Sequence, residues 1–298
     1  MNGTFSIGLT HWFLVGLIVG GISFADANDQ IPAAPQTHPI ALVGATIHPV
    51  DGPAIQQGIV LFENGTITAV GKNVNLPDGC RSVDTSGKHI YPGLMESMSN
   101  LGLTEIGSVR STIDTDELGD ENPNLRPWVA VNADSELIPV ARAGGVLLAS
   151  IAPKRGDIRG QSGVIQLDGW TYKEMLLRGD TGMIVSWRSY DSRKDDPVER
   201  SKERDERLKG LAERLEAAAR YAIARTARPE STPTDLRLDA LLPVIEGRSP
   251  MIIDADERRE IEAAVAFCVA RDIRPIIYGG YDAPQCAALL KKYDVPVI

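Results

Sequence analysis

The chain has 298 residues, of which 43% are hydrophobic and 24% are charged. This composition is typical of a globular protein and excludes a disordered, collagen-like or polytopic membrane chain. The formal net charge is -9 and the pI about 5.1, so no general basic field exists that would hold nucleic acid. The histidines are His11, His38, His48 and His89, so any metal or acid–base site after residue 89 must do without imidazole.

The first 27 residues have the pattern of a secretory signal peptide. Residues 12–22 are apolar, a run too short to cross a hydrocarbon core that needs about 20 residues. Ala25 and Ala27 supply the small residues that a signal peptidase reads. We therefore expect export to the periplasm or the medium, with no stable membrane span after cleavage. The alternative is an uncleaved membrane anchor.

The cysteines do not indicate a disulfide framework or a thiolate metal site. There are three, Cys80, Cys268 and Cys286, an odd number without CxxC spacing. Cys268 shares a helical face with Ile261 and Val265, which predicts a small core residue.

A small β module is expected after a linker at residues 28–38. Residues 39–91 contain short apolar runs typical of strands, and Asn64-Gly65 between two of them is a strong hairpin signal. A module of this size is too small to bury a good core by itself.

Residues 92–298 mix strands, helices and loops. The pattern predicts a polar loop at 108–126, a helix at 134–142, a strand at 146–151, a glycine-rich loop at 154–163 and strands at 164–167 and 183–187. Residues 159–163 in that loop could form a backbone nest for an anion or a plain turn. The polar loop is interpreted either as the rim of a pocket or as a solvated insertion.

The final hundred residues show the clearest architecture. Periodic Leu and Ala residues predict a long amphipathic helix at 197–227, and Thr232-Pro233 predicts the start of a second helix. Strands and helices then alternate, with strands at 251–253, 275–278 and 295–298 and helices at 257–271 and 283–292. Such alternation indicates parallel strands with right-handed crossovers, as in a TIM barrel or a doubly wound sheet. The absence of GxGxxG after these strands weakens the dinucleotide-binding version.

The N-terminal module resembles a known family. The segments GATIHPVDG, GIVLFENGTITAVGKNVNLP and VDTSGKHIYPGL are similar to the N-terminal part of the metal-dependent amidohydrolases, in particular the imidazolonepropionase-like group. The resemblance implies an α/β fold: a (β/α)8 TIM-type barrel over residues 92–298, with a small N-terminal β-sandwich-like module at 39–91. Roughly 210 residues remain for a barrel that needs about 250, so we expect an incomplete barrel. A missing C-terminal half or a second copy of the chain is then the expected partner.

The resemblance also implies a divalent metal, Zn, Mn or Mg, held by a His-x-His pair after the first barrel strand. Here that position reads Met98-Ser99-Asn100, and a thioether, a hydroxyl and an amide are poor ligands for Zn2+. Asp254 and Tyr278 stand near positions where the family has further histidines. The usual metal site is therefore expected to be degenerate.

Two interpretations follow. In the favoured one, the chain keeps an amidohydrolase-like pocket, with Glu96, Ser99, Asn100, Asp254 and Tyr278 as candidate residues, and has lost its metal. In the other, the carboxylates Glu96, Asp254 and Asp256 bind a metal weakly. The carboxylates also have simple structural roles, because Asp254 or Asp256 could cap the following helix and Glu96 is expected to face solvent.

The family chemistry is hydrolysis of C–N bonds in cyclic or linear amides and imides by a metal-activated water. The replaced metal ligands argue against that activity here, so whether the chain is an enzyme stays open. A protein of another class, a non-catalytic barrel that binds a small ligand or a protein partner, is the alternative.

Overall fold

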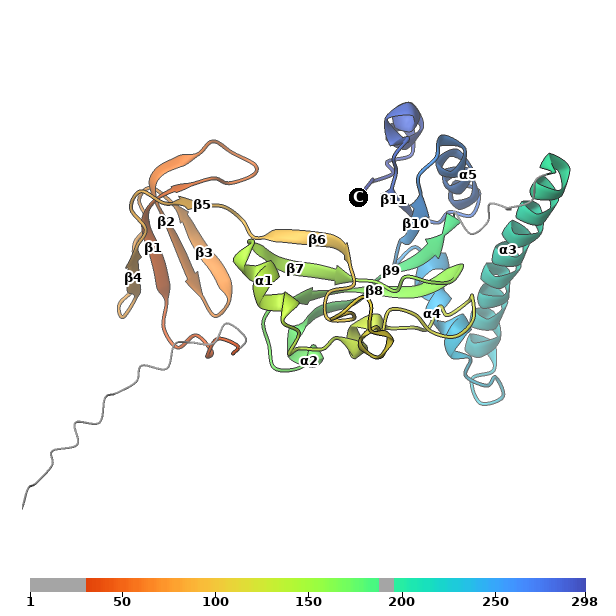
Figure 1. Ribbon diagram of the computed structural model, residues 1–298, viewed down its shortest axis with the longest axis horizontal. Helices are drawn as coiled ribbons and strands as arrows, with labels where there is room; N and C mark the ends of the chain where they lie inside the picture. Colours follow the sequence, from red (N-terminus) through yellow and green to blue (C-terminus); the bar gives the residue numbers. More distant parts are fainter. Residues whose placement is uncertain (1–30, 188–195) are drawn as a thin grey trace, which may run out of the picture.

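The structure is a computed structural model that describes residues 31–187 and 196–298. The expected signal peptide lies outside these residues. The described chain contains two β-sheets, a small one built from residues 40–90 and a larger one built from residues 94–279. Figure 1 shows the small sheet at one end of the molecule and the long helix α3 at the other.

The small sheet has five strands in the order β3-β2-β1-β4, with β5 also paired to β1. Asn64 and Gly65 join β2 to β3 with φ angles of 51° and 73°, the left-handed conformation that a two-residue hairpin needs. The predicted hairpin is thus confirmed. A sandwich-like module is not confirmed, because all five strands belong to one sheet. The strands are β1 (Ile40–Ile47), β2 (Ile55–Glu63), β3 (Thr66–Gly71), β4 (Arg81–Asp84) and β5 (His89–Ile90).

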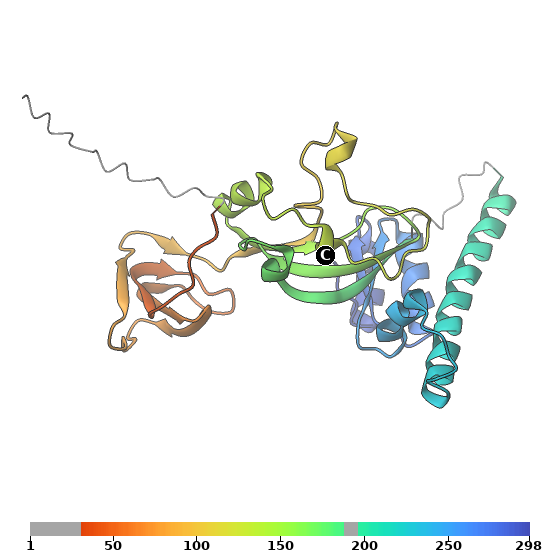
Figure 2. The ribbon, with the colours of Figure 1, turned by 90° about the horizontal axis from the view of Figure 1, so that it is seen from below.

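The larger sheet has six strands in the order β11-β10-β9-β8-β7-β6. Strands β6 and β7 are parallel, as are β9, β10 and β11, whereas β8 is antiparallel to both β7 and β9. The sheet curls like half of a barrel (Figure 2). The strands are β6 (Leu94–Ser99), β7 (Val146–Ile151), β8 (Ile158–Gln166), β9 (Leu176–Ser186), β10 (Met251–Ala255) and β11 (Pro275–Gly279).

The predicted mixed α/β fold is confirmed at this level, with two corrections. The described residues do not form a complete eight-stranded barrel. In addition, β7, β8 and β9 follow one another as antiparallel strands, where a barrel would have parallel strands joined by helices. The predicted loop over residues 154–163 was wrong from residue 158 onward, since β8 begins there. Residues 159–163 are therefore strand, neither a turn nor an anion nest.

The helix predicted at 197–227 is confirmed as α3, whereas α4 begins later than predicted. Its N-cap is Asp235, whose carboxylate accepts from the backbone N–H groups of Arg237 and Leu238 at 2.9 and 3.1 Å; Thr232-Pro233 lies in the preceding loop. The helices are α1 (Leu137–Ala143), α2 (Tyr172–Met175), α3 (Pro197–Ala227), α4 (Leu236–Ile245), α5 (Arg258–Val269) and α6 (Ala287–Lys292), with short 3-10 turns at Arg110–Thr112, Pro127–Ala130 and Ala283–Cys286.

The predicted last strand is reduced to one bridge. Val297 pairs with Ile277 of β11, and the Ile298 N–H donates to the Ile277 carbonyl at 2.9 Å. The C-terminal residues therefore extend the sheet in the parallel sense that the sequence indicated, but they do not form a regular strand.

The larger sheet has an outer face, covered by α3, α4, α5 and α6, and an inner face. Side chains alternate along a strand, so Met251, Ile253 and Ala255 of β10 pack under the helices while Ile252 points to the other side. Residues of the inner face form a separate apolar layer: Met98, Ala152, Ile184, Ile252, Ile276 and Tyr278.

Among residues 31–187 and 196–298, no helix is both long enough and apolar enough to cross a bilayer.

Candidate functional site

The larger sheet has one edge where strands of the same direction end. Five of its six strands run the same way, so their carboxyl ends meet there, and β8 begins at that edge. The Ser186 N–H at the end of β9 donates to the Asp157 carbonyl just before β8, at 2.9 Å. We call this the site edge, because α/β sheets bind ligands at the carboxyl ends of their strands.

Two of the predicted site residues meet at the site edge on the inner face. Asp254 of β10 is directly paired with Tyr278 of β11 and with Ser186 of β9. Asp254 lies two residues after Ile252 and Tyr278 two residues after Ile276, so both side chains share the inner face with the apolar layer. The structure thus joins the two candidates that are 24 residues apart in the sequence.

At this edge Asp254 forms an ion pair with Arg159. The Arg159 Nη2 lies 2.6 Å from the Asp254 Oδ2, and the two side chains are only 14% and 10% exposed. The expectation that Asp254 or Asp256 caps the following helix was wrong. The cap of α5 is Glu257, in a reciprocal arrangement with Glu260, whose Oε2 accepts from the backbone N–H groups of Asp256 and Glu257.

The sequence predicts Arg159 only as part of a turn or anion nest at residues 159–163, and not as a partner of Asp254. An antiparallel strand contributes the residues at its beginning to the edge where its neighbours end, and Arg159 is the second residue of β8. The alternation of side chains between the two faces of a strand over residues 158–167 could have predicted β8, but Gly160 and Gly163 obscure that pattern.

Glu96, Ser99 and Asn100 lie on or just after β6, and each forms a local hydrogen bond. Glu96 is exposed, and its Oε1 accepts from the Met98 N–H at 3.4 Å. The Ser99 Oγ accepts from the Leu101 N–H at 3.1 Å, and the Asn100 Nδ2 donates to the Thr104 Oγ1 at 3.0 Å. Ser99 and Asn100 thus stabilise the turn that leaves β6.

The polar loop that the sequence predicted lies against the start of β8. The Asp120 carbonyl accepts from the N–H groups of Asp157 and Ile158 at 2.7 and 3.0 Å, and the Leu125 carbonyl accepts from the Gln161 N–H at 2.9 Å. These bonds hold residues 120–125 of the loop beside the site edge.

The residues present do not fit the divalent metal that the family resemblance implies. Within the described ranges, no group of three or more His, Cys, Asp or Glu side chains could hold a metal ion. The carboxylate of Asp254 already binds a guanidinium, and Met98, Ser99 and Asn100 offer a thioether, a hydroxyl and an amide. We therefore derive no reaction step through a metal.

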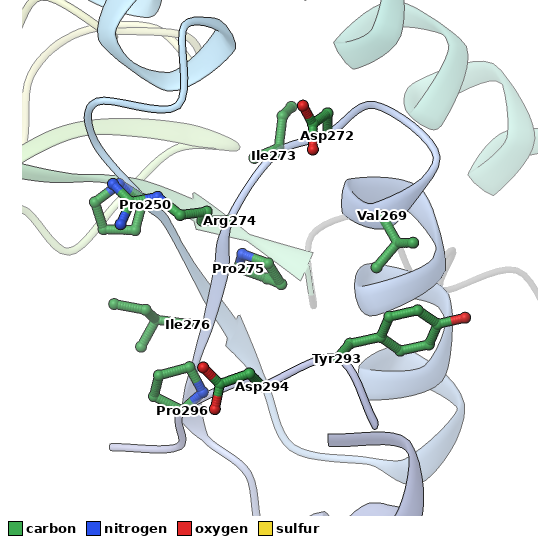
Figure 3. A pocket seen from close by; sticks show the side chains of 10 residues that line it. All are labelled: Pro250, Val269, Asp272, Ile273, Arg274, Pro275, Ile276, Tyr293, Asp294 and Pro296. Carbon is green, nitrogen blue, oxygen red and sulfur yellow. The ribbon is translucent and has the colours of Figure 1, made fainter. Parts of the chain in front are cut away.

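A cavity of about 480 Å3 opens at the other end of β10 and β11. It lies around Pro250 and Pro275, where these strands begin, and contains none of the candidate site residues (Figure 3). Its lining residues are Pro250, Val269, Asp272, Ile273, Arg274, Pro275, Ile276, Tyr293, Asp294 and Pro296. Its place at the amino ends of the strands makes it a less suitable reaction site than the site edge.

Solved structures identify the class of fold. No family model and no curated protein sequence matches the chain. An amidohydrolase from Thermotoga maritima MSB8 superposes with a TM-score of 0.76 at 24% sequence identity, over 87% of this chain and 69% of that one. A prolidase complexed with N-methylphosphonate-L-proline superposes with a TM-score of only 0.44, at 14% identity over 87% of this chain and 65% of that one. This likeness is too low to support the fold assignment.

The chain therefore has an amidohydrolase-like fold. It spans about two thirds of the length of the Thermotoga protein, and at this level of identity the likeness is one of fold.

Proposed function

We propose that this protein is an exported amidohydrolase-type protein of the imidazolonepropionase-like group, whose inner face holds small molecules that contain a cyclic or linear amide or imide. The observation that carries the proposal is the meeting of Asp254 and Tyr278 at the site edge, in a chain that shares the fold of the Thermotoga amidohydrolase.

The inner face offers complementary chemistry for such a ligand. The apolar side chains of Ile184, Ile252 and Ile276 form a layer against which a flat amide or imide ring can pack, since burial of apolar surface is favourable. The Tyr278 hydroxyl at the border of this layer can donate a hydrogen bond to a carbonyl oxygen.

The side chains at the positions of the usual metal ligands restrict the class of reaction. In this proposal the site is a degenerate one, in which Met98, Ser99 and Asn100 replace the usual metal ligands. The protein then binds and orients the amide without hydrolysis by a metal-activated water.

The first experiment measures ligand binding by the full mature chain. Lactams, cyclic imides and N-acyl amino acids are screened for thermal stabilisation, and each mixture is analysed for hydrolysis products with and without Zn2+ or Mn2+. We expect at least one of these ligands to raise the melting temperature without product. Metal-dependent turnover that Asp254→Asn abolishes would contradict the degenerate site, and no binding by any of the three ligand types would contradict the ligand class.

A matched pair of variants tests the position of the ligand. Tyr278→Phe removes one hydroxyl at the inner face, and Tyr281→Phe removes one from a side chain that is 86% exposed. We expect Tyr278→Phe to weaken binding of a carbonyl ligand about tenfold, in line with the loss of one hydrogen bond of about 1.4 kcal/mol, and Tyr281→Phe to leave it unchanged.

Export and assembly complete the proposal. The support for export is the apolar run and the small residues before Asn28; N-terminal sequencing of secreted material should give a chain that begins near Asn28. For assembly, a second copy or a further polypeptide would pair with the open edge at β6 or continue the sheet beyond the C-terminal residues beside β11, which size-exclusion chromatography with light scattering would detect.

A further inference from the structure

The cavity at the amino ends of β10 and β11 has the size of a ligand site. Its volume of about 480 Å3 lies within the range of about 300 to 1,000 Å3 that small-molecule sites occupy. It contains neither Asp254 nor Tyr278, so a ligand held here would be independent of the proposed function.

Backbone hydrogen bonds fix the walls of this cavity. The Met251 N–H donates to the Arg274 carbonyl, and the Ile277 N–H donates to the Pro296 carbonyl, both at 2.9 Å. Prolines, whose φ is fixed by the ring, supply much of the apolar surface, which comes mainly from Pro250, Val269, Ile273, Pro275 and Pro296. Walls that are ordered before binding lower the entropic cost of taking up a ligand.

Three charged side chains also line the cavity: the carboxylates of Asp272 and Asp294 and the guanidinium of Arg274 (Figure 3). Within residues 31–187 and 196–298, none of these three side chains forms a hydrogen bond or an ion pair. An exposed charge without a partner is ordinary on a protein surface. Here, however, charges of both signs line one partly apolar cavity and do not neutralise each other.

The two carboxylates occupy positions where a neutral side chain would suit the fold better. The φ angles of Asp272 and Asp294 are 57° and 52°, and asparagine tolerates this left-handed backbone equally well. Asp272 also follows the carboxyl end of α5, where the helix dipole favours a cation. A positively charged group bound in the cavity would offset this unfavourable negative charge.

We infer that this cavity binds a free α-amino acid with an apolar side chain. The ammonium group of the ligand pairs with the aspartate carboxylates, and its carboxylate accepts hydrogen bonds from the Arg274 guanidinium, whose fork of N–H donors suits a carboxylate. The apolar side chain of the ligand packs against the prolines and Val269, where its surface is removed from water.

A ligand with a single charge fits this cavity less well. An amine leaves the Arg274 guanidinium without an anion and brings a second cation close to it, and a carboxylate does the same to the two aspartates. Preference for a molecule that carries both charges is therefore the property that distinguishes this site from an apolar depression.

The first measurement compares three probes that share one ring and differ in charge. L-Phenylalanine carries both charges, phenethylamine only the ammonium, and phenylpropionate only the carboxylate. Their dissociation constants for the full mature chain are determined by calorimetry. We expect L-phenylalanine to bind about tenfold or more tightly than either of the other two, since each of them loses one charged pairing.

Variants then locate the ligand. Arg274→Met removes the guanidinium, and Asp272→Asn combined with Asp294→Asn removes both carboxylates. The matched controls are Arg237→Met on α4 and Asp78→Asn, both at exposed positions outside the cavity. We expect Arg274→Met and the combined variant each to weaken L-phenylalanine binding about tenfold, and the controls to leave it unchanged. Exposed substitutions of this kind rarely affect folding, and the melting temperature of each variant verifies this.

Three results would overturn the inference. They are the absence of measurable L-phenylalanine binding, equal binding of either singly charged probe, and an affinity that Arg274→Met or the combined variant reduces no more than the controls do. Tyr278→Phe should leave L-phenylalanine binding unchanged, and a loss confined to that variant would place the ligand at the site edge and also overturn it. None of the probes contains an amide or imide, so a failure of the proposed function would leave this result intact, and the reverse also holds.

Discussion

Cys268 is a thiol enclosed by the outer-face core. It has no exposed surface and lies on α5 with Ile261 and Val265, as the helical spacing predicted. Burial raises the pKa of this thiol from its ordinary value of 9.0 to about 12, since the charged form is poorly solvated there. Cys268 is therefore a protonated, unreactive thiol at neutral pH.

The raised pKa predicts a loss of stability at alkaline pH. The unfolded thiol ionises near pH 9, whereas the folded thiol keeps its proton to about pH 12. The contribution of Cys268 to the unfolding free energy is therefore fully present below pH 9 and decreases as the pH rises from 9 to 12. The shift corresponds to about 4 kcal/mol at its upper limit. The difference in unfolding free energy between the unmodified chain and Cys268→Ala, measured in urea at pH 8 and pH 10.5, should shrink; a constant difference would contradict it.

Asp272 closes α5 in an unfavourable state. Its φ of 57° is left-handed, and its negative charge lies at the helix carboxyl end, where the helix dipole favours cations. We expect Asp272→Asn to stabilise the protein by roughly 0.3 to 1 kcal/mol, because asparagine tolerates this conformation and carries no charge. Urea unfolding measures the effect, and Asp78→Asn, in an exposed turn, should be neutral.

At the scale of elements, the start of α4 distinguishes the structure from the sequence interpretation. Asp235 caps the helix, and the neighbouring Thr234 is exposed. We expect Asp235→Ala to lower the unfolding free energy by about 1 kcal/mol. Thr234→Ala should change it by less than 0.5 kcal/mol. Equal effects of the two substitutions would place the cap elsewhere.

Elements with a strong local period could be predicted, and elements held by distant partners could not. The helix at 197–227 was predicted because its apolar residues recur at helical spacing, and the strand at 146–151 because it is a short apolar run between two glycines and a proline. In contrast, β8 contains Gly160 and Gly163, which read as a loop, although Gly163 is required where the Trp128 ring lies against the strand.

The candidate site divides in the same way. Asp254 and Tyr278 could be predicted because each lies near the end of a recognisable buried strand. Arg159 could not be predicted in this way. Its ion pair with Asp254 depends on the antiparallel strand β8 between β7 and β9, and no local sequence pattern indicates that reversal.

For the whole molecule, the two sheets have separate interiors. Val60 of β2 is buried in the small sheet, whereas Ile253 of β10 is buried in the outer-face core of the larger sheet. The strand path from one sheet to the other passes through residues 91–93, between β5 and β6, as Figure 1 shows. Separate cores joined by a short segment favour separate unfolding transitions.

We therefore expect scanning calorimetry to resolve two transitions. Val60→Ala should lower the temperature of one, and Ile253→Ala should lower the other, each by several degrees, since a large-to-small core substitution costs about 2 to 5 kcal/mol for Ile to Ala and somewhat less for Val to Ala. A single transition that both substitutions lower equally would show that the sheets unfold together.

Strand β8 contains a β-bulge near Gly160, and this bulge affects how related sequences align with this chain. Ile158 and Gln161 are three residues apart but pair with Val185 and Met183, which are two apart, so β8 contains one additional residue there. Gly160 has a φ of 128°, and a Cβ at this position would lie 2.8 Å from the Leu125 carbonyl. A related chain with a one-residue gap here, or with any residue larger than glycine, would not align its guanidinium with the carboxylate on β10. A single column of an alignment would thus distinguish chains with this charge arrangement from those without it.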